Sequence, residues 1–133
     1  MSAQIRPASA GRAYEALPQL TDTGSQTWIT RGANFVVAIS EVQPGAVLSR
    51  ADNPDEYMVL LGGVAATIRA GAETIEAAPE SLTIVPPGSS EVVAKGAGHV
   101  VRVLSNRATD LLAKAENAAT YADGAAEVAP LVP

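Results

Sequence analysis

Short apolar runs, separated by turns rich in glycine and proline, make up most of the chain between residues 20 and 105. Runs of this length that are rich in valine, isoleucine and threonine are typical of β-strands. Strands are therefore predicted at residues 27–30, 33–42, 47–50, 56–61, 64–69, 73–77, 82–85, 91–94 and 98–105. Short strands with turn signals about every ten residues are typical of an all-β barrel or sandwich.

After residue 106 the spacing of the apolar residues changes to that of an α-helix. Leu111, Leu112, Ala115 and Ala118 recur at helical spacing and predict one helix over residues 108–120. Residues 1–16 carry few bulky apolar side chains and are expected to form a flexible arm. The predicted organisation is thus an arm (1–16), a barrel (17–106), and a C-terminal helix with a proline-rich tail (107–133).

Composition narrows the class of protein. The chain has 133 residues, 47% of them hydrophobic, which suits one domain with its own core. The net charge is −5 without a basic cluster, so neither nucleic acid nor an anionic membrane surface is an expected partner. There is no cysteine, which excludes disulfides, thiolate catalysis and cysteine-ligated zinc. The sequence shows neither a secretory signal nor an apolar run of membrane-spanning length, and a cytoplasmic location is expected.

The order of strands and turns resembles that of the cupin superfamily between about residues 35 and 105. Two motifs characterise that family, G-x5-H-x-H-x3,4-E-x6-G and G-x5-P-x-G-x2-H-x3-N. Glu56 and Gly63 have the spacing of the last two positions of the first motif, and Pro86 and Gly88 match the P-x-G of the second. Gly45 stands one residue too close to fit the first glycine, which requires a single deletion.

The resemblance implies a double-stranded β-helix, a jelly-roll-like barrel that is commonly dimeric, in which three histidines and a glutamate hold a metal. Here Arg50 and Asp52 stand at the histidine positions of the first motif, Glu91 stands at that of the second, and only Glu56 is retained. A guanidinium would repel a divalent ion, and three carboxylates beside it make a poor cage for magnesium or calcium. No metal and no cofactor are therefore expected, and an arginine–carboxylate network is expected in their place.

Strand parity allows Arg50, Asp52, Glu56 and Met58 to face the barrel interior, with Glu91 approaching from the opposite strand. These five are the predicted ligand-binding residues, and Arg50 is available for an anionic group. A competing interpretation places the first three in a solvated corner and Glu91 at an exposed strand start.

Three hypotheses for function remain open. The first is a metal-free homodimeric barrel that binds a small molecule or serves a structural or regulatory role. The second is a cupin-type enzyme, an isomerase, lyase or metal-dependent oxygenase, with Glu56 and Glu91 as the candidate catalytic pair because paired carboxylates support acid–base chemistry. The third is the non-catalytic lobe of a two-domain cupin, which the proline-rich tail suggests. His99, the single histidine, is interpreted as a half-buried or surface residue.

Overall fold

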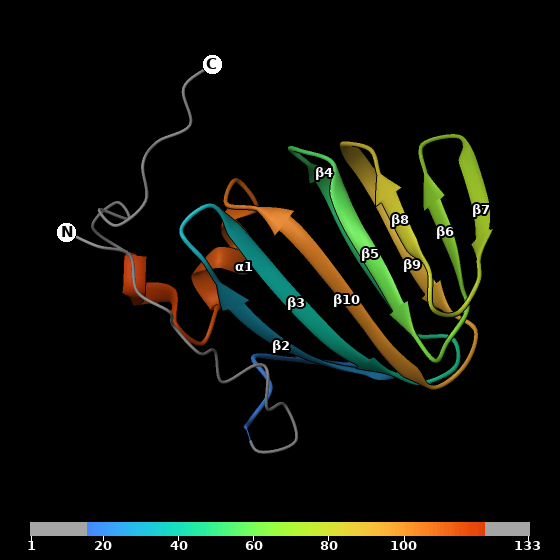
Figure 1. Ribbon diagram of the computed structural model, residues 1–133, viewed down its shortest axis with the longest axis horizontal. Coiled ribbons are helices and arrows are strands. Elements are labelled where there is room, and N and C mark those ends of the chain that lie inside the picture. The colour runs from blue at the N-terminus through green and yellow to red at the C-terminus, as the bar shows by residue number, and fades with distance from the viewer. Residues whose placement is uncertain (1–15, 122–133) are drawn as a thin grey trace.

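The computed structural model describes residues 16–121, which form ten β-strands, one α-helix and one 3-10 helix (Figure 1). The strands are β1 (Leu20–Asp22), β2 (Ser25–Arg31), β3 (Phe35–Val42), β4 (Val47–Asn53), β5 (Tyr57–Gly62), β6 (Ala66–Ala70), β7 (Glu73–Ala77), β8 (Leu82–Val85), β9 (Gly88–Ala94) and β10 (Gly98–Ser105). The predicted N-terminal arm, apart from its last residue, and the C-terminal tail lie outside the described residues.

The strands form two antiparallel sheets that pack face to face. The larger sheet has the order β1-β2-β3-β10-β5-β8 and the smaller one has the order β4-β9-β6-β7. The chain passes from one sheet to the other six times, between β3 and β4, β4 and β5, β5 and β6, β7 and β8, β8 and β9, and β9 and β10. The all-β jelly-roll prediction is therefore confirmed, and all nine predicted strands are present (Figure 1). The short strand β1 was not predicted, because Leu20 is its only apolar residue.

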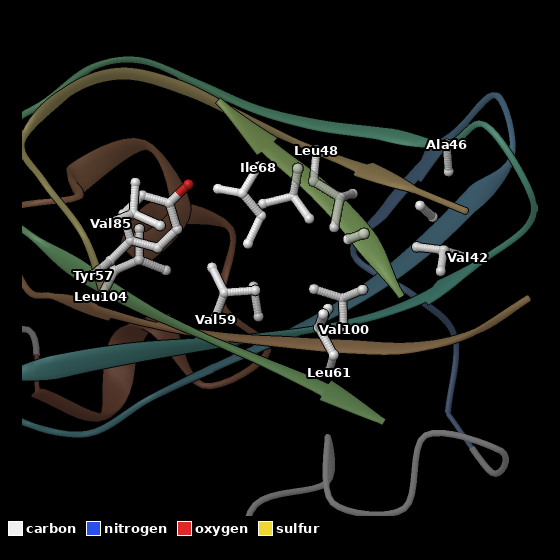
Figure 2. Close-up of a cluster of buried hydrophobic side chains, with 14 of the residues drawn as sticks. Val42, Ala46, Leu48, Tyr57, Val59, Leu61, Ile68, Val85, Val100 and Leu104 are labelled. Carbon is white, nitrogen blue, oxygen red and sulfur yellow. The ribbon is translucent and has the colours of Figure 1, made fainter. Parts of the chain in front are cut away.

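Alternation along the strands fills the space between the sheets. In β10, Val100 and Leu104 are buried and face the smaller sheet, whereas Val101 between them is only partly buried on the outer side. Figure 2 shows Val100 on the side of the layer opposite Leu48, and Leu104 beside Tyr57 and Val85. Each fully buried side chain of this size contributes about 1.5–3 kcal/mol to folding, so this layer is the main source of stability.

The C-terminal helix is shorter than predicted. It runs as α1 (Thr109–Lys114) and ends where Ala115 turns to an extended conformation, with ψ at 143°. The next residue, Glu116, donates its N–H to the carbonyl of Ile29 at 2.8 Å, which takes the chain out of the helix and onto β2. A 3-10 helix, Ala118–Tyr121, follows. No helix among residues 16–121 is long and apolar enough to span a membrane.

Candidate functional site

Arg50 on β4 points into the space between the sheets and is 8% exposed. Its Nη1 and Nη2 donate to the two carboxylate oxygens of Asp110 at 2.8 and 2.9 Å, and its Nε donates to Asn53 Oδ1 at 2.9 Å. Asp110 belongs to the first turn of α1. The two-pronged hydrogen bond from Arg50 holds the pKa of Asp110 below its ordinary value. Arg50 therefore fastens the C-terminal helix to the edge strand of the smaller sheet.

A β-bulge in β4 sets which side chains follow Arg50 into the interior. The pairing of β4 with β9 shifts register between Arg50 and Asn53, and Asp52 adopts a φ of 51°. The extra residue reverses the parity of the strand, so Asn53 is buried and Asp52 is exposed. Aspartate tolerates this left-handed conformation better than most residues.

The structure does not bring the five predicted residues together. Arg50 is buried as expected, but Asp52 and Glu56 are exposed, Met58 is 37% exposed, and Glu91 is partly buried. The interior position expected for the last four is therefore corrected. The bulge accounts for the outward position of Asp52, whereas on β5 and β9 the alternation of each strand places the neighbour of each glutamate inside.

The inward neighbours are Tyr57 and Ser90. Tyr57 is 2% exposed, and its hydroxyl forms a 2.7 Å hydrogen bond with the Ser90 hydroxyl across the two sheets. Figure 2 shows the Tyr57 ring inside the hydrophobic layer beside Val85 and Leu104. Glu56, which precedes β5, and Glu91 on β9 do not meet in the interior as a carboxylate pair.

Glu91 has a separate environment on the outer face of the smaller sheet. It accepts a hydrogen bond from Arg69 Nη1 at 2.6 Å, and both side chains are more than a third exposed. Together with Ser49 and Ser89 they line an open depression of about 400 Å³. The assignment of Glu91 as a ligand-binding residue stays a prediction, and its place is this outer depression.

A second arginine, which the sequence analysis did not select, lies inside the barrel. Arg102 alternates with Val100 and Leu104 on the inner face of β10 and is 4% exposed. Its Nε has no hydrogen-bond partner, and no ion pair joins its guanidinium to another residue in the range 16–121. The pKa of Arg102 is lowered to about 10, chiefly by burial; the like charge of Arg50 also lowers it, whereas Tyr57 and Asp110 act in the opposite direction.

Both arginines line one cavity of about 220 Å³. It lies where β1 and β2, at one edge of the larger sheet, approach the edge strand β4 of the smaller sheet, beside α1. The lining is mixed, with charged or hydroxyl side chains on several sides and apolar ones between them. Its residues are Leu20, Thr21, Asp22, Ser25, Thr27, Val47, Leu48, Ser49, Arg50, Arg102, Asp110 and Leu111.

The interior side chains do not suit the metal centre that the family motifs imply. No group of three or more histidine, cysteine, aspartate or glutamate side chains with metal-binding geometry occurs among residues 16–121. The inward polar groups on β4 and β10 include two guanidinium groups, which donate hydrogen bonds and repel cations. The donor set therefore favours an anion over a divalent ion at this place.

Comparison with known proteins identifies the fold. No family model and no curated protein matches the sequence. Among solved structures, KdgF from Halomonas sp. is similar with a TM-score of 0.59 and 17% identity, over 69% of this chain and 87% of that chain. A cupin superfamily protein from Desulfitobacterium hafniense gives a TM-score of 0.57 and 16% identity over 78% of this chain and 94% of that one.

An RmlC-like cupin from Desulfovibrio desulfuricans is similar as well, with a TM-score of 0.56 and 17% identity over 68% of this chain and 90% of its own. The two-sheet sandwich with its short C-terminal helix is therefore a jelly roll of the RmlC-like type. The chain therefore has the cupin fold, as the motif skeleton predicted.

Proposed function

We propose that this chain is a cupin-type barrel that binds a small molecule in the cavity beside Arg50 and Arg102, without a metal centre. The observation that carries the proposal is the burial of Arg50, which stands at the first histidine position of the motif and is bound on three nitrogens by Asn53 and Asp110. A salt bridge with hydrogen bonds on both partners takes over the structural role of a metal by joining β4 to the helix.

The cavity has the character of a ligand site. Ligand pockets combine apolar walls with a few convergent polar groups, and this one joins two arginines and the Ser25 hydroxyl to Leu48 and Leu111. The candidate catalytic pair Glu56 and Glu91 lies outside it. Binding is therefore better supported than acid–base catalysis by that pair.

Metal content tests one half of this proposal. The protein would be produced in medium supplemented with iron, manganese, nickel and zinc, and analysed by inductively coupled plasma mass spectrometry. We expect each metal far below one equivalent per chain. A stoichiometric transition metal that survives gel filtration would overturn the metal-free assignment.

A blocked-cavity variant tests the other half. Thr21 is exposed on β1 and lines the cavity, whereas Thr23, also exposed, does not line it. Compounds that raise the Tm in a screen of small polar molecules should lose their effect in Thr21→Trp and keep it in Thr23→Trp. Ligands that stabilise both variants equally would place binding elsewhere and refute the cavity assignment.

We also propose that the outer face of the larger sheet binds a second copy of the chain. Strand register aligns two apolar rows across β8, β5, β10 and β3. The rows are Ile84-Met58-Val103-Val37 and Leu82-Leu60-Val101-Ile39. Because neither row contains a charge, two identical faces can pack in a symmetric dimer without burying an unpaired ion. Residues Met58, Leu60, Leu82 and Ile84 are 37–55% exposed in the single chain, which supports a covered face.

A further inference from the structure

We infer that the ligand of the cavity is a small monocarboxylate, bound through the guanidinium of Arg102. The inference rests on the proposed small-molecule function and names the chemical class that the site selects. It follows from the difference between the two arginines of the cavity, from their combined charge with Asp110, and from the size of the space.

The two arginines differ in their supply of acceptors. Arg50 donates hydrogen bonds from all three of its nitrogens to Asn53 and Asp110, so each nitrogen already has an acceptor within the protein. Arg102 is equally buried, yet its Nε has no hydrogen-bond partner within residues 16–121. A buried donor without an acceptor is rare in folded proteins, because it has lost its water without compensation. A carboxylate beside Arg102 would supply two acceptor oxygens in the planar geometry that a guanidinium prefers.

The charges of the cavity favour a single negative charge on the ligand. Arg50 and Asp110 neutralise each other through their salt bridge, so the charge of Arg102 is the one that a bound carboxylate would neutralise. Asp22 also lines the cavity, from the exposed strand β1, and its negative charge disfavours a dianion at the entrance. A phosphate dianion or a dicarboxylate would therefore meet repulsion that a monocarboxylate avoids.

The size and the remaining walls define the rest of the molecule. A volume of about 220 Å³ is below the range of about 300–1,000 Å³ that drug-sized ligands occupy. The space therefore suits an acid of a few carbon atoms. Leu48 and Leu111 can contact its hydrocarbon part, and the Ser25 hydroxyl can bond a hydroxyl or carbonyl on it.

The decisive experiment observes the Arg102 Nε–H group directly. The full chain, labelled with ¹⁵N in arginine, would be titrated with propionate and lactate, with propionamide as an uncharged control, in buffer without chloride. The Nε–H resonance of Arg102 is assigned by its absence in Arg102→Met. We expect a saturable shift of that resonance with both acids in the millimolar range and none with the amide.

Variants and competing anions separate the outcomes. Arg102→Met should weaken propionate binding at least tenfold, as measured by calorimetry, whereas Arg107→Met, at a 68% exposed arginine that does not line the cavity, should leave it unchanged. Equal binding of chloride, inorganic phosphate and propionate would overturn the carboxylate assignment, as would binding that survives Arg102→Met. If no carboxylate binds, but neutral compounds do and Thr21→Trp blocks their binding, the carboxylate inference fails and the proposed small-molecule function stands. If nothing binds in the cavity, both the inference and the proposed function fail.

Discussion

Replacement of Arg102 by methionine should make the unliganded protein more stable. The pKa of this guanidinium is lowered to about 10, chiefly by burial, which corresponds to about 3 kcal/mol against the charged form in the folded state. Methionine keeps most of the side-chain volume, removes the charge and can contact Leu48 and Leu111 in the same cavity. Since some of the penalty is relieved by cavity water in solution, we expect a net gain of about 1–3 kcal/mol.

The sign of the pH dependence follows from the depressed pKa. The folded protein carries the full penalty wherever Arg102 is protonated, and the penalty is relieved only as the pH rises above about 10. The difference between wild type and Arg102→Met should therefore be constant between about pH 6 and pH 8.

Urea unfolding followed by tryptophan fluorescence at several pH values measures this difference, because Trp28 is buried. Arg69→Met is the matched control: its arginine is 52% exposed and paired only with Glu91, so a change within about 1 kcal/mol is expected. A loss of more than about 1 kcal/mol in Arg102→Met would refute the reasoning, because it would show that Arg102 stabilises the fold as it stands.

Three further substitutions test the bulge, the salt bridge and the outer face. Asp110→Asn leaves the Arg50 charge without a carboxylate and should lower the free energy of unfolding by about 1–3 kcal/mol at pH 7, measured with urea. Because the pKa of Asp110 is lowered in the folded protein, the stabilisation from the pair is lost as the pH falls through that pKa. The free energies of unfolding of the variant and the wild type should therefore converge in acid. Asp52→Val puts a β-branched residue at a φ of 51° and should cost about 1–2 kcal/mol, whereas Asp52→Gly should be tolerated. Leu60→Lys should lower the mass seen by light scattering from dimer to monomer, and Leu17→Lys, at an 86% exposed leucine, should not; a wild-type protein that is already monomeric contradicts the dimer.

The strands could be predicted from the sequence because alternation and turn chemistry are local properties. The interior residues could not, because one extra residue in β4 changes which side chains point inward. Nothing in the alternation around Asp52 marks the bulge, although aspartate and asparagine side by side are permissive for a left-handed residue. Glu56 lies in the corner between β4 and β5, and the side chain that β5 buries there is its neighbour Tyr57.

The burial of Arg102 could have been predicted from the sequence. This arginine is the one charged residue on the inward phase of the strand GHVVRVLS, between Val100 and Leu104. Asp110 had no such signal, since its contact with Arg50 depends on how α1 packs 60 residues further along the chain. Local patterns can thus identify a charge that must be buried, but the tertiary structure decides which partner it receives.

The contrast between the two arginines separates structure from function inside this barrel. A buried cation with a complete set of acceptors, such as Arg50, is accounted for by folding alone, since removal of either partner destabilises the protein. A buried cation that lacks them, such as Arg102, makes the unliganded fold less stable than an apolar side chain would. Binding sites accept such a cost because a ligand that supplies the acceptor recovers it on binding. The interior of this barrel therefore holds one arginine whose acceptors come from Asn53 and Asp110 and another, Arg102, for which we propose a ligand as the acceptor.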